Sequence, residues 1–345
     1  MNSSAIALSS LLLVATFAAQ EPAPPIAPVA PVAPIAPIAA TQKPAAKVAE
    51  PTYDEKADAR VVVAAALARA RKENRRVLIQ WGANWCGWCN WLAATMKADS
   101  ETRRKLLYEY DVVHVDVGRF NKHMDLAKEL GAEFKSIPYL TILDSSGKAL
   151  VQQATEPFEI KESDAKGNHH DPKKFVTWLT EHQAAPLVAK DVHAAALAQA
   201  KTENKRVFMH FGAPWCGWCH RLENWMAEPE IAALLAKDFV DLKIDQDRMT
   251  GGKEMIDAEI AAAGVKAGGI PWFVFSDAAG KQLANSTGPK GNTGFPYKED
   301  EVAHFATMLN TVRVNLTDAD IATLLASLNA IRTADEAKKK AAAAH

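Results

Sequence analysis

The sequence has little cysteine and almost no net charge. Its 40 basic and 41 acidic residues give a formal net charge of −1. This balance provides no electrostatic basis for binding nucleic acid or an anionic membrane surface. The four cysteines form two Cys-x-x-Cys pairs, Cys86/Cys89 and Cys216/Cys219, so none is left for a scattered disulfide framework. The cysteines therefore indicate a role in chemistry rather than structural disulfide cross-links.

The composition is otherwise that of a soluble globular protein. Hydrophobic residues make up 48% and charged residues 23% of the 345 positions. This length suffices for about two domains of roughly 100–200 residues each.

The sequence also lacks an apolar run of membrane-spanning length at its N-terminus. The run at residues 5–19 is shorter than the roughly 20 residues that a spanning helix needs. Small residues at 16–19 favour cleavage, so residues 1–20 are interpreted as an export signal, although the first residues carry no Lys or Arg. An uncleaved anchor is the alternative. We expect a periplasmic or secreted protein without stable membrane insertion after signal cleavage.

Residues 21–52 form an Ala/Pro-rich linker. Closely spaced prolines remove backbone donors and hold a chain extended, which predicts a semi-rigid spacer. A ligand for a proline-recognition domain is the alternative, but the tract lacks charged anchors.

The rest of the chain repeats itself. The segment at 64–77 has a counterpart at 194–207, and Gly-Ala-Asn-Trp-Cys-Gly-Trp-Cys at 82–89 has the counterpart Gly-Ala-Pro-Trp-Cys-Gly-Trp-Cys 130 residues later. A period of this size indicates a duplicated domain rather than a solenoid. We place domain 1 at 53–184, domain 2 at 185–332 and a flexible tail at 333–345, with fraying after Ala334.

Each copy alternates helical and strand patterns, which predicts an α/β fold. In the first copy we expect helices at 54–72, 122–130 and 171–182, and strands at 76–81, 111–117, 139–143 and 149–153. In the second copy we expect helices at 191–202, 253–263 and 298–311, and strands at 206–211, 239–244, 272–275 and 281–284. A last helix begins at Thr317, with Asp320 completing a capping box. Each Cys pair directly follows a strand and opens a helix.

That position explains the spacing of the cysteines. At the start of a helix, residues i and i+3 lie on one side, so their sulfurs reach disulfide geometry with little backbone movement. The leading cysteine, Cys86 or Cys216, lies at the helix N-terminus, where free N–H groups and the helix dipole stabilise a thiolate. The thiolate is the nucleophile of thiol–disulfide exchange, and Cys89 or Cys219 then resolves the mixed disulfide.

Residues around each pair add to this hypothesis. Trp88 and Trp218 offer either a flat apolar contact beside the sulfur or packing beneath the helix. Pro138 follows Ile137, and Pro271 follows Ile270, each just before an apolar strand. A cis bond there would turn the chain back beside the sulfurs, and a trans proline starting an edge strand is the alternative.

The segments 77–89 and 207–219 resemble the thioredoxin superfamily, and Leu-Lys-Ile-Asp-Gln at 242–246 and Gly-Gly-Ile-Pro-Trp-Phe-Val-Phe at 268–275 are similar to its later strands. The segment at 225–235 resembles the exported branch, which includes the thioredoxin-like domain of the bacterial transmembrane disulfide reductase. The resemblance extends over most of residues 53–314.

The resemblance implies two tandem thioredoxin-like domains, each with a central mixed β-sheet flanked by helices. It implies Cys86 and Cys216 as attacking thiols and Cys89 and Cys219 as resolving thiols. It also implies cis bonds before both prolines, with isoleucine backbones pairing with a bound peptide as an added strand. The expected substrate-binding residues are Trp85, Trp88, Ile137, Pro138, Trp215, Trp218, Ile270 and Pro271.

Three features depart from the family pattern. Gln80 and His210 stand where relatives place a buried Asp or Glu, so His210 is a candidate proton relay, with a satisfied core histidine as the alternative. Ala94 and Asn224 replace the usual kinking proline. Long polar stretches at 155–171 and 285–297 precede the last helices, and the first contains His169-His170-Asp171, which we interpret as a solvated loop rather than a metal site.

The leading hypothesis is therefore an enzyme that exchanges dithiols and disulfides in exported client proteins. It needs no cofactor and no metal, works as a monomer, and depends on an unidentified redox partner that recycles its sites. A thioredoxin-fold binding module or chaperone without turnover is one alternative. A zinc site made by all four cysteines is another. The direction of electron flow is not readable from the sequence, because reduction potentials of related sites span about −270 to −120 mV.

Overall fold

The computed structural model of the protein describes residues 51–160, 169–266 and 268–343. The expected signal and all but the last two residues of the expected spacer lie outside these residues. No helix within the described ranges has both the length and the apolar character needed to cross a membrane.

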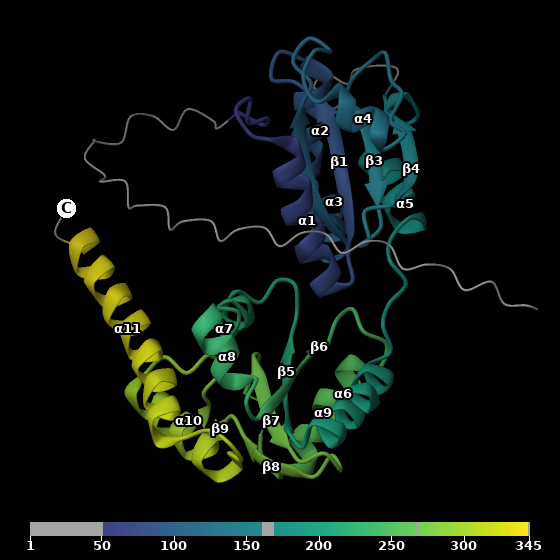
Figure 1. The fold of residues 1–345 in the computed structure, drawn as a ribbon. Coiled ribbons are helices and arrows are strands. Elements are labelled where there is room, and N and C mark those ends of the chain that lie inside the picture. Colours follow the sequence, from purple (N-terminus) through teal and green to yellow (C-terminus); the bar gives the residue numbers. More distant parts are fainter. Residues whose placement is uncertain (1–50, 161–168, 267, 344–345) are drawn as a thin grey trace, which may run out of the picture. The chain divides into compact units, whose positions relative to one another are not determined.

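The first copy is a four-stranded mixed sheet flanked by helices (Figure 1). Its strand order is β2-β1-β3-β4, with β1 parallel to β2 and antiparallel to β3, and with β3 antiparallel to β4. The strands are β1 (Arg76–Gly82), β2 (Tyr110–Asp116), β3 (Tyr139–Leu143) and β4 (Ala149–Ala154). The helices are α1 (Ala59–Glu73), α2 (Gly87–Ala98), α3 (Ser100–Glu109), α4 (Met124–Glu129), the short 3-10 helix η1 (Glu156–Phe158) and α5 (Pro172–Glu181).

The second copy repeats this sheet with the order β6-β5-β7-β8 and the same strand directions. Its strands are β5 (Arg206–Gly212), β6 (Phe239–Asp245), β7 (Trp272–Ser276) and β8 (Gln282–Asn285), and a small hairpin pairs β9 (Thr287–Gly288) with β10 (Gly291–Asn292). Its helices are α6 (Ala189–Glu203), α7 (Gly217–Met226), α8 (Pro229–Leu235), α9 (Gly252–Ala262), α10 (Glu299–Val312) and α11 (Asp318–Ala343). The expected fold, two tandem thioredoxin-like domains, is confirmed.

Both faces of each central strand are buried, because successive side chains point to opposite faces. In β1, Val77, Ile79 and Trp81 pack with α1 and α4, whereas Leu78 packs with α2, α3 and α5. The same alternation in β5 divides the second core, and Phe208 joins the face covered by α7, α8, α10 and α11. Gln80 and His210 therefore point toward the helices that carry the cysteines.

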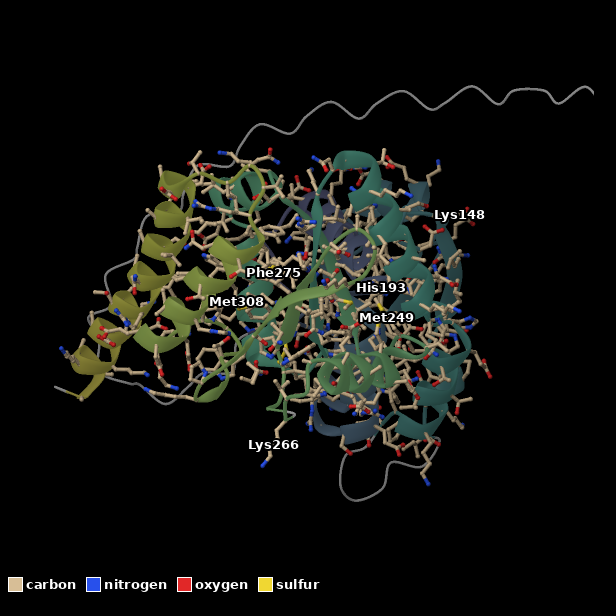
Figure 2. All side chains as sticks on the ribbon, turned by 90° about the horizontal axis from the view of Figure 1, so that it is seen from below. Lys148, His193, Met249, Lys266, Phe275 and Met308 are labelled. Atoms are coloured by element: carbon tan, nitrogen blue, oxygen red, sulfur yellow. A yellow bond between two sulfur atoms is a disulfide. The ribbon has the colours of Figure 1, made fainter. Side chains whose placement is uncertain are left out.

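The second copy ends in two helices, α10 and α11, and α11 has no counterpart in the first copy. Phe275 on β7 and Met308 on α10 lie in one buried cluster between the sheet and these helices, whereas Lys148 and Lys266 project from the surface (Figure 2). The fully buried Asp238 carboxylate accepts hydrogen bonds from the backbone N–H groups of Val314, Asn315 and Leu316, at 2.6–3.1 Å. This side chain fixes the turn between α10 and α11.

Most element boundaries agree with the sequence analysis to within two residues. The first helix is shorter than expected, because Asp58 caps it and accepts from the N–H groups of Arg60 and Val61. Thr317 and Asp320 make the expected capping box. Where the sequence analysis expected a flexible tail, α11 continues to Ala343, and the Arg221 guanidinium pairs with Asp335.

Candidate active site

Each Cys-Gly-Trp-Cys segment lies at the junction of the central strand and the following helix. Cys86 is the N-cap of α2, and Cys216 is the N-cap of α7. The Sγ of each accepts the backbone N–H of the second cysteine at 3.1 Å. Each pair forms a disulfide across a Cα–Cα distance of 5.3 Å. The predicted position of the leading sulfur at the helix N-terminus is thus what the structure shows.

The proline loops lie beside these sulfurs. The Ile137–Pro138 and Ile270–Pro271 bonds are both cis. The carbonyl oxygen of Ile137 lies 3.6 Å from Cys86 Sγ, and that of Ile270 lies 3.6 Å from Cys216 Sγ. The structure therefore brings these four predicted residues to the two sites at equivalent positions.

Tryptophan side chains of the two motifs lie on the solvent-exposed side of each site. Trp85, Trp215 and Trp218 are each about half exposed, at 53%, 56% and 51%. The Trp85 indole donates to the Gly118 carbonyl, and the Trp215 indole donates to Asp247, both at 2.8 Å. These hydrogen bonds fix large apolar surfaces next to each leading cysteine.

The second tryptophan of each motif differs between the copies. Trp88 is half-buried and packs edge-on against Trp91, His169 and His170. Trp218 instead contacts Phe295 and Tyr297, and the Arg221 guanidinium lies 5.0–5.4 Å from all three ring centroids. Trp88 is thus partly covered by its aromatic and histidine neighbours, whereas Trp218 is half exposed and has a cation beside its ring.

Behind the first disulfide lie uncharged polar groups. Gln80 is fully buried and donates to the Cys89 carbonyl at 3.0 Å. Tyr53 is also fully buried, and Asn84 clamps its backbone with hydrogen bonds of 3.0 and 2.9 Å. Burial holds the pKa of the Tyr53 hydroxyl far above its usual range, so this group remains a neutral donor.

Charged groups lie behind the second disulfide. His210, the candidate relay, is 2% exposed, and its Nε2 lies 3.0 Å from Asp241 Oδ1. Glu223 on α7 is buried next to Lys243 of β6, whose ammonium lies 2.9 Å from both carboxylate oxygens. Burial opposes ionisation of Glu223, but His220 and Lys243 outweigh it and lower its pKa to about 2.

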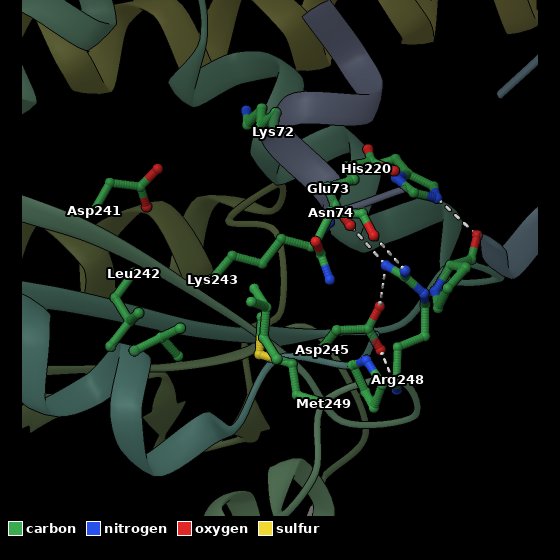
Figure 3. Close-up of a pocket in the computed structure, with 14 residues that line it drawn as sticks. Lys72, Glu73, Asn74, His220, Asp241, Leu242, Lys243, Asp245, Arg248 and Met249 are labelled. Atoms are coloured by element: carbon green, nitrogen blue, oxygen red, sulfur yellow. Dashed lines mark hydrogen bonds and ion pairs between the residues drawn. The ribbon is translucent and has the colours of Figure 1, made fainter. Parts of the chain in front are cut away.

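A cavity of about 300 Å³ opens behind this charged group. His220, Asp241 and Lys243 line it, together with Arg248 (Figure 3). His220 Nε2 donates to the Pro214 carbonyl at 2.8 Å, and its Nδ1 lies 3.8 Å from Glu223. The nearby Glu223 carboxylate raises the pKa of His220, although burial opposes this. The imidazole is 39% exposed, so it connects the buried carboxylate with solvent.

The interpretation of residues 169–171 as a solvated loop is wrong for its second histidine. His170 is fully buried against Trp88, and His169 stacks on Trp91 at 3.5 Å between ring centroids. The neighbouring residues 161–168 lie outside the described part of the chain. Burial lowers the pKa of His170 to about 4, so this imidazole is neutral at pH 7.

Two arrangements bear on metal binding. In the oxidised state shown here, each cysteine pair is closed on itself and offers no thiolate to a shared ion. Among the described residues, the ligand atoms of Glu73, His220 and Glu223 lie within 4.8 Å of one another. The Lys243 ammonium already neutralises Glu223 at 2.9 Å, so a cation does not fit this group well.

Sequence reasoning missed Tyr53 and Glu223. Tyr53 stands at the edge of the expected spacer, and only its aromatic type in a stretch of polar residues distinguishes it. Glu223 lies four residues after Cys219, one helical turn along the same face, and this spacing was the available signal.

Comparisons with known proteins agree with this geometry. A family model described as "Protein of unknown function, DUF255" matches residues 172–332, and one described as "Thioredoxin-like" matches residues 58–145. Protein disulfide-isomerase erp38 of Neurospora crassa is 28% identical over 185 residues, which are 53% of this chain and 47% of that protein. Human spermatogenesis-associated protein 20 is 34% identical over 71 residues, 20% of this chain and 9% of that protein. The matched region thus spans about half the length of the first relative and far less of the second.

Two solved structures are also similar. A disulphide isomerase from Xylella fastidiosa Temecula1 is 26% identical, with a TM-score of 0.33, covering 38% of this chain and 95% of that one. A DsbH oxidoreductase is 22% identical, with a TM-score of 0.25, covering 35% of this chain and 81% of that one. Taken with the family models and the repeated sheet order, the two Cys-x-x-Cys sites show that this chain belongs to the thioredoxin superfamily.

Proposed function

We propose that this protein is a thiol–disulfide oxidoreductase that acts on exported client proteins through two dithiol sites. The observation that carries the proposal is the position of each leading sulfur. Cys86 and Cys216 each cap a helix, accept a backbone N–H at 3.1 Å and lie 3.6 Å from the carbonyl oxygen of the residue before a cis-proline. Such a position stabilises a thiolate and leaves a backbone acceptor beside it.

In the reducing direction, the Cys216 thiolate attacks one sulfur of a client disulfide. The client S–S bond breaks, a mixed disulfide forms, and the departing client sulfur takes up a proton. The Cys219 thiol then loses its proton and attacks Cys216 Sγ, which releases the second client thiol and closes the enzyme disulfide. Cys86 and Cys89 perform the same steps at the first site. A dithiol partner must then return two electrons and two protons to each site.

Client binding uses the surface around each sulfur. The carbonyl of Ile137 or Ile270 accepts from an extended client segment, which adds to the site as a short strand. Trp85 with Trp88, and Trp215 with Trp218, flank that segment with apolar surface. The relative from Neurospora crassa is named a protein disulfide-isomerase, which supports a client that is itself a protein.

The test is the rate at which the full chain reduces a disulfide-bonded test protein in the presence of a small dithiol. We expect Cys86→Ser and Cys216→Ser each to remove one site's contribution, and the double variant to reduce the rate to that of the small dithiol alone. An unchanged rate in the double variant would refute the proposal. If that variant still suppressed aggregation of an unfolded client, the result would favour a binding module without turnover.

Export is the second part of the proposal and has its own test. The apolar run at residues 5–19 followed by small residues is the feature that supports it. We expect the mature protein in the periplasmic or secreted fraction, with an N-terminus near residue 20 by sequencing. An intact N-terminus in the membrane fraction would show an uncleaved anchor instead.

A further inference from the structure

The two copies differ in what surrounds the tryptophan between their cysteines. At the first site Trp88 packs against three rings of the same copy, those of Trp91, His169 and His170. Arg221 occupies the position 130 residues after Trp91, so the second copy has a cation where the first has an indole. The first site therefore covers its tryptophan with rings of its own, whereas Trp218 at the second site remains 51% exposed.

A cavity of about 420 Å³ lies beside Trp218 at the second site. Ile270 and Pro271 also line it, and the Ile270 carbonyl oxygen lies 3.6 Å from Cys216 Sγ. The Tyr297 ring is part of the cavity wall, and its centroid lies 5.9 Å from that of Trp218. The cavity is therefore continuous with the surface that we propose binds the client.

The β9–β10 hairpin supplies another side of this cavity. The Asn292 amide donates to the carbonyl oxygens of Gly269 and Pro271, at 3.0 and 2.9 Å. Its Oδ1 accepts from the Gly294 N–H at 3.2 Å. Gly268, which also lines the cavity, packs so closely that a methyl group on it would lie 2.6 Å from Asn292 Cβ. The hairpin and the cis-proline loop are thus joined, so the shape of the cavity is set before a client arrives.

The helix α11, which has no counterpart in the first copy, supports the aromatic wall. The Arg221 guanidinium pairs with Asp335 of α11. The same guanidinium lies 5.0–5.4 Å from three ring centroids, those of Trp218, Phe295 and Tyr297. A cation at this distance attracts the faces of aromatic rings, so Arg221 helps to fix the three rings in place.

Charged side chains also line the cavity. The Lys298 ammonium pairs with the Glu301 carboxylate at 2.9 Å, so these two charges offset each other. Lys339 of α11 adds one further cation. Because aromatic rings and Pro271 form the part next to the cysteine, we expect a ring rather than a charged group to occupy the cavity.

The geometry of a bound client determines which of its side chains reaches the cavity. Successive side chains of an extended segment point to opposite faces. The client cysteine points toward Cys216, so the residues two positions before and after it point to the same side, roughly 7 Å along the chain. The residues directly next to the cysteine point away from the site.

We propose that this cavity is a specificity pocket of the second site, which selects clients that carry an aromatic residue two positions from the reacting cysteine. A client ring in the pocket leaves water and pairs with the exposed Trp218 and with Tyr297. The rings around Trp88 show that flat side chains pack against the tryptophan of this motif. At the first site the chain supplies these rings itself, so we expect no such selection there. This inference rests on the proposed thiol–disulfide exchange.

Rates of peptide reduction test the inference in the full-length protein. One protein carries Cys86→Ser and Cys89→Ser and retains only the second site, whereas the other carries Cys216→Ser and Cys219→Ser and retains only the first. Each substrate is the symmetric disulfide of a peptide with one cysteine and with phenylalanine, leucine, aspartate or alanine two positions from it. At the second site we expect kcat/KM to be about tenfold higher for phenylalanine than for alanine. At the first site the two values should be close.

A matched peptide and two variants locate the selection. Phenylalanine directly next to the client cysteine should give a rate close to that of alanine, because its side chain points away. Trp218→Ala should remove the preference for phenylalanine at the second site. Tyr297→His installs the residue of the first copy, since His170 and Tyr297 each directly precede the N-cap of a helix, and it should weaken the preference. The alanine peptide is the internal control, because a misfolded variant would lose its rate with both peptides.

The outcomes separate this inference from the proposed function. Equal rates with phenylalanine and alanine at the second site, or an equal preference at the first site, would overturn the inference and leave the function standing. A rate with leucine as high as that with phenylalanine would show that the pocket does not select rings. A preference for aspartate would assign the cavity to charge recognition by Lys339 and would also overturn the inference. Failure of the second site to reduce any of the peptides would instead refute the function.

Discussion

The position of Cys216 at the start of α7 predicts how acidic its thiol is in the reduced protein. A hydrogen bond to a charged acceptor contributes roughly 1.5–3 kcal/mol, and Cys216 Sγ accepts one from Cys219 N–H at 3.1 Å. The helix dipole adds about 0.3–1 kcal/mol. Together these terms amount to about 2–4 kcal/mol, or about 1.5–3 pKa units at 1.36 kcal/mol per unit. From an ordinary value of about 8.5, the expected pKa of Cys216 is about 5.5–7.

The assay follows the alkylation rate of Cys216 against pH in a full-length protein that carries Cys89→Ser, Cys86→Ser and Cys219→Ser. The rate should reach half its maximum near the predicted pKa, because the thiolate is the reactive form. The same protein in denaturant is the control, and its cysteine should titrate near about 8.5. Equal values for the folded and unfolded chains would refute the reasoning. The equivalent protein with only Cys86 should behave alike, since its sulfur accepts the same hydrogen bond at 3.1 Å.

Three further predictions concern stability, each measured by denaturant unfolding. Gly82→Ala should destabilise the protein by about 1–3 kcal/mol, because the added methyl overlaps the Tyr53 hydroxyl, whereas the matched Gly212→Ala meets no atom closer than 3.2 Å and should cost less; equal losses would contradict the packing described. Asp238→Asn should cost about 2–4 kcal/mol, because three backbone N–H groups lose a charged acceptor, and a loss below about 0.5 kcal/mol would contradict that role. Burial, with a smaller effect of Lys97, lowers the pKa of His114 to about 4, below its unfolded value of about 6.5. His114 therefore stabilises the protein by up to about 3 kcal/mol above pH 6.5, and this is lost as the pH falls through 4; His114→Asn should flatten that slope, and an unchanged slope would contradict the assignment.

Much of the fold was predictable because the duplication supplied each pattern twice. The segments at 64–77 and 194–207 both contain a Glu-Asn step, and both asparagines adopt the left-handed conformation that ends a helix, at φ 51°. The mostly apolar runs at 77–81 and 207–211 were predicted as strands, and four residues separate each run from its leading cysteine. In these regions the local sequence patterns and the duplication therefore predicted the same helices and strands.

The helices α3 and α8 and the hairpin of β9 with β10 were missed. Each is short, and α3 has few buried side chains, so its pattern is dominated by charged residues. The Lys/Ala-rich composition of the C-terminal segment is itself typical of a helix, and α11 continues through this segment to Ala343.

The sulfur positions could be predicted, but what lies behind them could not. A Cys-x-x-Cys motif that follows a strand specifies the helix N-terminus, whereas Tyr53, which lies behind the first site, comes from a distant part of the chain. Tyr53 precedes α1 in the chain, and hydrogen bonds between its backbone and the Asn84 side chain hold it at the first site. The second copy has Pro214 in place of Asn84. Only the three-dimensional structure brings together residues with such separations.

Trapping of the mixed disulfide tests most directly whether both sites exchange disulfides. The full-length Cys219→Ser protein, with serine also at Cys86 and Cys89, would be reduced and mixed with a disulfide-bonded test peptide. Mass spectrometry should show one peptide chain joined to Cys216, and the corresponding protein with Cys89→Ser should hold one at Cys86. The account would be contradicted if no adduct formed at either leading cysteine, or if the adduct persisted after Cys216→Ser.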